Sequence, residues 1–309
     1  MRKLLSLIIV LVLLSCIGCS QTELEKNPKS VLLDDTGYVI NITYIPKRIV
    51  SLSPSNTEIL FAIGAGDRVV GVTDYCNYPP KVLKMKETGR LKSVGGYSTV
   101  NIERVVGLDP DLVVASYGNG LETIETMRNL GLTVVAFNPK NLSDIKREIL
   151  ILGKITGNSK NASKLVEMID KRISKIEKKV SGKKKLKVCH IIWHDPIWVT
   201  GKQTFINEII EISGGVNAFN FNGWRIVSIE DIIAANPDVI LVNSGTGMVG
   251  GKNLIYDWVM NETRLKVVNA IKFGRVYVID ADLISRPSYR LVLAAEEIAK
   301  FLHPEAFSS

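Results

Sequence analysis

The sequence predicts an α/β fold made of two similar lobes, each a parallel β-sheet flanked by helices, with one long helix joining them. Three observations predict this fold. Strands alternate with helices along the chain, one helix–strand unit occurs twice, and a long amphipathic helix separates its two copies. The 309 residues, of which 46% are hydrophobic and 23% charged, suit two globular lobes of ordinary size.

The N-terminus has the features of a lipoprotein signal. Two basic residues precede an apolar run over residues 4–14, and small residues and cysteines follow. This region resembles a lipobox, whose cysteine becomes the acylated first residue of the mature chain. Cys16 has the better leucine three residues before it, whereas Cys19 has the better preceding glycine, and we favour Cys19. An ordinary cleaved signal with incidental cysteines is the alternative. We assign residues 1–18 to the signal and 19–36 to a flexible tether.

The first lobe, residues 37–157, begins with a strand–helix–strand pattern. β-branched residues fill 48–52 and 69–72, and between them the helix 56–63 has capping side chains before it and glycines after it. A loop with two tyrosines follows the second strand. In open α/β folds this edge of the sheet binds small ligands, so we expect a ligand site there.

An internal repeat identifies the second lobe. Residues 228–241 align with residues 101–114 without a gap, and each copy reads as a capped helix, an Asx-Pro break and a buried strand. The alignment pairs Glu103 with Glu230 in the first turn of each helix. These two acids either complement the helix dipole or present one charge per lobe to a partner.

A long helix over residues 159–180 joins the two lobes. Its apolar residues recur on one stripe, and about 22 residues of helix span roughly 33 Å. This length predicts a stiff strut, so we expect lobes that move little relative to one another. The linking segment is residues 158–182, and the second lobe is residues 183–305.

The charge and the titratable residues point away from several functions. The net charge of +8 is concentrated in the signal and in one helix and its exit loop, without the interleaved aromatics of a nucleic-acid binder. No HExxH, GxSxG or phosphate-binding glycine motif occurs, so we expect no enzyme, no metal and no cofactor. His190 reads as a core histidine. A ligand or metal role for His194, at the end of its strand, stays open. We expect no disulfide between Cys76 and Cys189.

Aromatic side chains are the stronger signal for a site. The rings fall in loops expected at one edge of the two sheets, where each alone could also be ordinary packing under a loop. Together they indicate a flat apolar ligand edged by rings, with arginines available for its acidic groups. The predicted ligand-binding residues are Tyr75, Tyr97, Trp198, Trp224 and Arg286.

The order of several motifs resembles the cobalamin and iron-siderophore binding proteins of ABC importers, most closely the vitamin B12-binding ones. These motifs are RIVSLSPSNTEILFAIG, GVTDYCNYPP, NIERVVGLDPDLVVA, VTGKQTFINEIIEISGGVN and VSIEDIIAANPDVILV. The resemblance implies a class III substrate-binding protein with two Rossmann-like lobes. It implies pocket aromatics at Tyr75, Trp198 and Trp224, and Tyr97 matches a further one on a loop whose length differs from the family's.

The resemblance also implies that Glu103 and Glu230 dock on arginines of the membrane permease. The chain departs from the family before its last helix, where Leu283–Ile284–Ser285–Arg286 replaces bulky aromatics. This smaller and more basic lining leaves room for cobinamide, haem or an iron chelate.

We therefore expect a monomeric binding protein, lipid-anchored at the outer face of the cytoplasmic membrane. It would capture a corrinoid, either cobalamin or cobinamide, and deliver it to an ABC permease. The alternative ligands are a ferric siderophore or haem. A metal-dependent enzyme or a ligand sensor fits the sequence less well.

Overall fold

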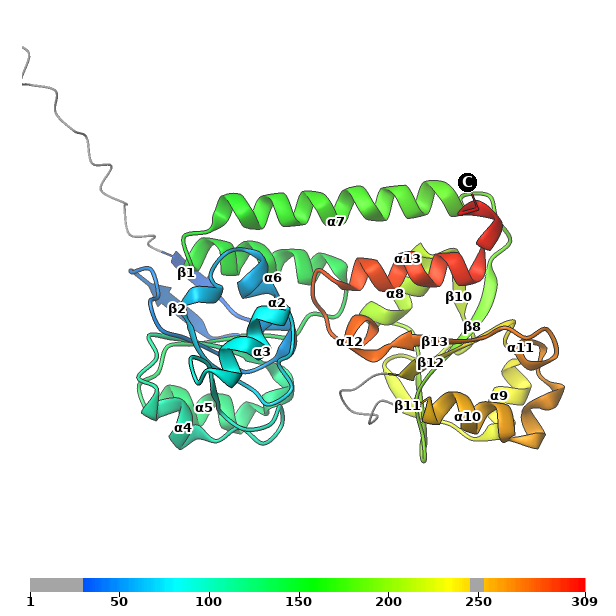
Figure 1. Cartoon of the computed structure of the whole chain (residues 1–309), viewed down its shortest axis with the longest axis horizontal. Coiled ribbons are helices and arrows are strands. Elements are labelled where there is room, and N and C mark those ends of the chain that lie inside the picture. The colour runs from blue at the N-terminus through cyan, green and yellow to red at the C-terminus, as the bar shows by residue number, and fades with distance from the viewer. Residues whose placement is uncertain (1–29, 245–252, 309) are drawn as a thin grey trace, which may run out of the picture.

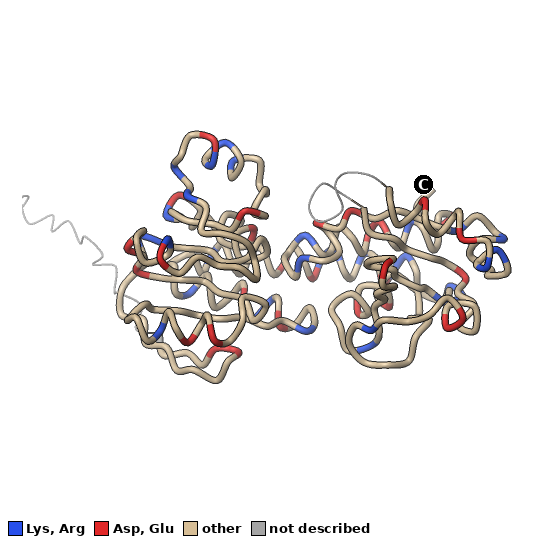
Figure 2. The backbone as a smooth tube through the Cα atoms, turned by 90° about the horizontal axis from the view of Figure 1, so that it is seen from below, with Lys and Arg blue, Asp and Glu red and all other residues tan. Residues whose placement is uncertain are grey.

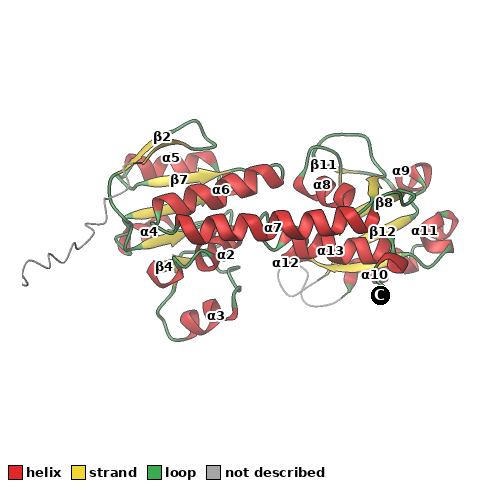
Figure 3. Ribbon diagram, turned by 90° about the horizontal axis from the view of Figure 1, so that it is seen from above, coloured by secondary structure: helices red, strands yellow, loops and turns green. Residues whose placement is uncertain are grey.

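The computed structural model describes residues 30–244 and 253–308, which form two α/β lobes spanned by the helix α7 (Figure 1). In the first lobe the sheet has the strand order β5–β4–β3–β6–β7, and all of its strands are parallel. Helices cover both of its faces, as the alternating pattern predicts (Figure 3). The strands are β3 (Ile49–Ser51), β4 (Val69–Val72), β5 (Lys92–Ser93), β6 (Leu112–Ser116) and β7 (Val134–Phe137). The helices are α2 (Pro54–Ala62), α3 (Pro80–Glu87), α4 (Ile102–Gly107), α5 (Leu121–Asn129) and α6 (Leu142–Ile155).

The second lobe has a mixed sheet, where the sequence predicted a parallel one. Its order is β11–β9–β8–β12–β13, with β10 also paired to β8. The strands β8 and β9 form an antiparallel hairpin, and β11 extends it, whereas the other pairs are parallel. The strands are β8 (Leu186–His194), β9 (Ile197–Thr200), β10 (Gly215–Asn217), β11 (Trp224–Ile226), β12 (Val239–Ser244) and β13 (Val276–Asp280). The helices are α8 (Phe205–Ile212), α9 (Ile229–Ala235), α10 (Leu254–Asn261), α11 (Asn269–Lys272), α12 (Ala281–Ile284) and α13 (Leu291–Leu302).

The structure corrects two local predictions in the first lobe. Part of the expected tether is the strand β1 (Ser30–Leu33), which pairs antiparallel with β2 (Val39–Ile42). This hairpin is anchored because Ile40 and Ile42 on its inner face are buried in the core. The segment after Pro80, which the sequence presented as a polar connector, is the helix α3, held to the core by the buried residues Val82 and Met85.

The internal repeat has one structural explanation in both lobes. Asp109 and Asn236 have left-handed backbones, with φ of 45° and 41°, and each ends its helix before the proline. The aspartate that follows the proline then accepts hydrogen bonds from the chain entering the central strand. Asp111 accepts from the backbone N–H groups of Lys47 and Arg48, and Asp238 accepts from that of Lys187. The repeated sequence therefore encodes the end of a helix and an aspartate that binds the backbone at the start of β3 or β8.

The linking helix α7 (Ser159–Val180) has the bounds that the sequence predicts. It packs on α6 of the first lobe and on α13 of the second. The approach to α6 is close, because a Cβ atom at Gly153 would collide with the Cβ of Ala162. In the second lobe Arg172 of α7 forms an ion pair with Glu296 of α13 at 3.1 Å.

His190 is a core residue of the second lobe, in agreement with the sequence analysis. It is fully buried in β8, and its ring nitrogens lie 2.8 Å from the hydroxyl of Thr200 and 2.9 Å from the amide oxygen of Asn243. Burial lowers the pKa of His190 to about 4, because a charged imidazolium would lose its hydration there.

This burial predicts an acid-sensitive stability. In the unfolded chain His190 takes up a proton near pH 6.5, whereas in the folded chain it stays neutral until the pH falls to about 4. Its contribution is therefore fully present above about pH 6.5 and is lost as the pH falls. Between pH 7 and pH 5 the free energy of unfolding, measured by urea denaturation, should fall by about 2 kcal/mol more in wild type than in His190→Gln. The half-exposed His194→Gln is the control and should keep the wild-type loss; an unchanged loss in His190→Gln would contradict the assignment.

Candidate ligand-binding site

The carboxyl ends of the two sheets face each other. Three contacts establish this, and each joins a segment that follows a strand of one lobe to such a segment of the other. Asn77, after β4, donates to Asp282, after β13, at 2.8 Å. The N–H of Leu142, after β7, donates to Glu208 of α8 at 2.7 Å. Glu58 of α2, after β3, is bonded to the segment 286–290. The edge at which parallel sheets bind ligands is thus shared by both lobes.

Tyr75 lies on the loop after β4 with a side chain that is 48% exposed. The loop is fixed beneath the ring by Cys76, which is buried and within 3.2 Å of the hydroxyls of Thr57 and Thr73. Burial raises the pKa of the Cys76 thiol, so it remains a neutral core group. An exposed ring on an anchored loop can contact a ligand with little loss of conformational entropy.

Tyr97 is more strongly engaged with its own lobe. Its hydroxyl lies 2.8 Å from that of Ser116 at the end of β6, and its carbonyl accepts a hydrogen bond of 2.7 Å from Asn119. The ring covers Gly118, where even a Cβ atom would collide with it. The side chain is half-buried, and the ring of Tyr75 is close to this loop, since a Cβ atom at Gly96 would lie 3.7 Å from it.

Trp198 and Trp224 share one face of the ribbon formed by β9 and β11. In the antiparallel register Trp198 is opposite Ile226, and Trp224 is opposite Thr200. Opposite residues project to the same side, so the two indoles are diagonal neighbours. Their side chains are 37% and 39% exposed, and Trp224 packs edge-on against Phe205 with ring centres 6.2 Å apart. Large apolar groups left accessible on one face are typical of a binding surface.

Arg286 differs from the sequence expectation. We expected a ligand-facing cation, but only about 10% of its side chain is exposed, and its guanidinium is occupied by protein groups. It is ion-paired with Glu58 at 3.0 Å and with Asp282 at 2.6 Å, and it also donates to Asn77. The sequence analysis missed Glu58, whose signal was an acid in the middle of an otherwise uncharged helix. Because that helix is buried, its acid required a cationic partner.

Glu103 and Glu230 occupy equivalent exposed positions. Each lies in the first turn of its helix, α4 or α9, after a residue whose side chain caps that helix. Both helices lie on the side of the molecule away from α7, one in each lobe (Figure 1). Glu230 has a loose ion pair with Arg264 at 3.6 Å. Seen from this side, basic and acidic positions are scattered over both lobes (Figure 2).

His194 lies between the rings of Trp193 and Trp258, with centroids 5.0 and 5.8 Å away. Its Nδ1 is buried and has no hydrogen-bond partner in the part of the chain that the structure describes. Across residues 30–244 and 253–308, no three His, Cys, Asp or Glu side chains gather as metal ligands. Cys76 and Cys189 are both free and buried. Cys19, the predicted acylation site, lies outside the described residues.

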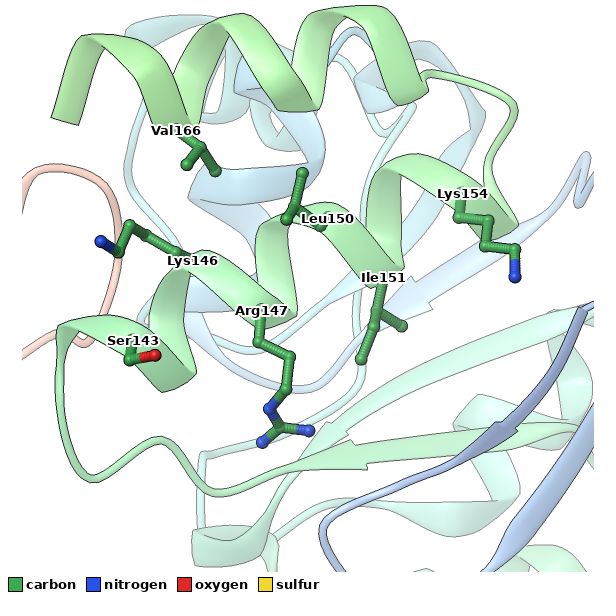
Figure 4. A pocket seen from close by; sticks show the side chains of 7 residues that line it. All are labelled: Ser143, Lys146, Arg147, Leu150, Ile151, Lys154 and Val166. Carbon is green, nitrogen blue, oxygen red and sulfur yellow. The ribbon is translucent and has the colours of Figure 1, made fainter. Parts of the chain in front are cut away.

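One groove of the described chain lies away from this site. It is a groove of about 460 Å³ between α6 and α7, lined by aliphatic and basic side chains (Figure 4). It has no aromatic lining; six of its lining residues, Leu150 among them, belong to α6, and Val166 belongs to α7. The groove therefore lacks the rings that the candidate site has, and we locate the site by its side chains instead.

Comparison with known proteins identifies the family. The family model described as periplasmic binding protein matches residues 49–283, from β3 to α12. The chain belongs to this family. It is a family of binding proteins and not an enzyme family. Within the described residues, no helix has the length and apolarity needed to cross a bilayer.

Relatives of this binding protein agree with the family and the fold. The ABC transporter substrate-binding lipoprotein YvrC of Bacillus subtilis, itself uncharacterised, is 33% identical over 308 residues, which cover 94% of this chain and 93% of the relative. The crystal structure of the vitamin B12-binding protein BtuF of Vibrio cholerae superposes with a TM-score of 0.70 at 27% identity, covering 85% of this chain and 99% of that one. The haem-binding protein RhuT from Roseiflexus gives 0.73 at 26% identity, covering 84% and 99%. The predicted class of fold, two α/β lobes joined by a long helix, is confirmed.

Proposed function

We propose that this chain is an extracytoplasmic binding protein, anchored through acylated Cys19, that captures a corrinoid and delivers it to an ABC permease. The observation that carries the proposal is the pair of accessible indoles, Trp198 and Trp224, on one face at the edge where the lobes meet. The corrin ring of cobalamin and cobinamide is broad and flat with apolar faces. Rings that are already positioned can cover such faces without ordering a loop.

The walls of the proposed site come from both lobes. The first lobe supplies Tyr75, with the edge of Tyr97 beside it, and the second supplies the two tryptophans. Phe205 supports Trp224, and one turn later on α8 Glu208 contacts the first lobe, so this wall lies near the boundary between lobes. The names of the relatives support the ligand class, since BtuF of Vibrio cholerae is a vitamin B12-binding protein.

Replacement of the indoles tests the ligand site. In isothermal titration with cobinamide, Trp198→Ala and Trp224→Ala should each weaken the affinity roughly tenfold, because each loses one stacked or edge contact. Phe273→Ala, which removes an exposed ring at the end of α11, is the matched control and should bind as wild type does. Wild-type affinity in both tryptophan variants would contradict the proposed site.

Haem is the second candidate ligand, because RhuT, a haem-binding protein, superposes on the chain as well as BtuF does. The fold therefore does not discriminate between the two macrocycles. Titration of the wild type with cyanocobalamin, cobinamide, haem and a ferric catecholate should show the tightest binding for a corrinoid. Tighter binding of haem or of the iron chelate would replace the corrinoid in the proposal.

Delivery would use Glu103 and Glu230 as docking residues. Both carboxylates are exposed, and both lie on the side away from α7. Because of the internal repeat, each has the same position in the first turn of an equivalent helix. Two equal charges, one per lobe, would engage a permease of two similar halves. Exposed charges of this kind set orientation and association rate, whereas they contribute little to the fold.

Charge reversal tests docking. The double variant Glu103→Arg, Glu230→Arg should lose nearly all corrinoid uptake while its affinity for cobinamide in solution stays unchanged, because neither residue is among those proposed to contact the ligand. Uptake is measured in cells that lack their own binding protein and carry the cognate permease. Glu167→Arg with Glu177→Arg reverses two exposed acids of α7, on the opposite side of the molecule, and should transport normally. Normal uptake by the first pair would remove the docking assignment.

A further inference from the structure

A buried ionic cluster joins the lobes next to the aromatic site. Glu58 of α2 accepts hydrogen bonds from three side chains of the segment between α12 and α13. These are Arg286 at 3.0 Å, Arg290 at 3.0 Å and Ser288 at 2.5 Å. The carboxylate is fully buried, and the two arginine side chains are about 10% exposed. Figures 1 and 3 both show α12 on the flank of its lobe nearest to α2.

The charges of the cluster balance. Two carboxylates, Glu58 and Asp282, face the two guanidiniums, and Asp282 also accepts from Asn77 of the first lobe. Burial raises the pKa of Glu58, while Ser288 and both guanidiniums oppose that shift. A buried ion that loses one of its partners is left uncompensated, so each member is held by the others.

The same cluster holds the loop of Tyr75. Besides its ion pairs, Arg286 donates to the side-chain oxygen of Asn77 at 2.7 Å and to the backbone carbonyl of Tyr75 at 3.3 Å. Arg290 lies over the ring of Tyr78, with its guanidinium carbon 3.7 Å from the ring centre. The second lobe therefore contacts three of the four residues from 75 to 78. Arg286 bonds this loop directly and also bonds Glu58, which holds the arginine against the first lobe.

We propose that Arg286 is a positioning residue for the ligand site. Its guanidinium, oriented by Glu58, reaches from the second lobe and fixes the Tyr75 loop of the first lobe. The inference rests on the proposed function, because it concerns the ring that would contact the corrinoid. Arg286 itself does not touch the ligand. It orders the loop and the lobes before the ligand binds, so the binding free energy does not include the entropic cost of ordering them.

The test combines hydrogen exchange with titration on the full chain. In Arg286→Gln, backbone exchange in residues 73–79 should speed up at least tenfold, and the affinity for cobinamide should fall about tenfold. Arg286→Lys keeps the charge but loses the fork, so it should retain the fold and still show faster exchange in the loop. Arg172→Gln, which breaks the α7–α13 ion pair without touching the loop, is the matched control and should change neither quantity.

Three results separate this inference from the proposed function. If the wild type binds cobinamide and Arg286→Lys and Arg286→Gln leave loop exchange and affinity unchanged, the positioning role is wrong. If exchange rises equally throughout both lobes, the arginine is a general stabiliser and the positioning role is again wrong. If the wild type binds no corrinoid but loop exchange still rises selectively, the corrinoid proposal fails while the positioning of the loop stands.

Discussion

The relation between the two lobes depends on the buried contact of Glu58 with Arg286 and Arg290. The helix α7 sets the separation of the lobes, but a single connecting helix does not prevent each lobe from rotating about the end of α7 to which it is attached. The ion pairs lie across the lobe boundary from α2 and restrict that rotation. Removing one partner from such a pair costs about 3–5 kcal/mol, because the other charge stays buried without compensation. The lobes are therefore joined by the helix α7 on one side and held by the ion pairs of Glu58 on the other.

This constraint explains why the candidate site is built mostly of rings. Where two surfaces are held at a fixed spacing, a ligand is recognised by filling that space, and aromatic side chains provide large area at low entropic cost. In the account proposed here, the polar groups paired across the boundary hold the lobes together and the rings bind the ligand. Arg286 illustrates the division, since its charge is neutralised by Glu58 and Asp282. The rings of Tyr75, Trp198 and Trp224 remain accessible, and they are the ones proposed to contact the ligand.

Much of the fold could be predicted from the sequence because its signals are local. The bounds of α7 follow from its apolar stripe, and the repeat follows from a helix stop that needs a left-handed residue before proline. The strand β1 and the helix α3 were missed because each is short and is held by the fold around it, β1 by pairing with β2 and α3 by burial of Val82 and Met85. Neither segment has enough periodicity of its own to be read from the sequence.

The site was predicted in part for the same reason. Aromatics after a strand are visible in sequence, and the residues Trp198 and Trp224 do lie on one face of the β9–β11 ribbon. The role of Arg286 was not visible, because it depends on an acid 228 positions earlier in the chain. A buried ion pair is a property of the folded arrangement, and only the uncharged surroundings of Glu58 hinted at it.

A crystal structure of the wild-type protein with cobinamide tests the central claim most directly. The account predicts a corrin ring between the lobes, in contact with Trp198 and Trp224 on one side and Tyr75 on the other, with the bonds of Glu58 to Arg286 and Arg290 intact. A macrocycle bound elsewhere, such as the groove between α6 and α7, or one that displaces Arg286 from Glu58 to pair with it directly, would contradict the account.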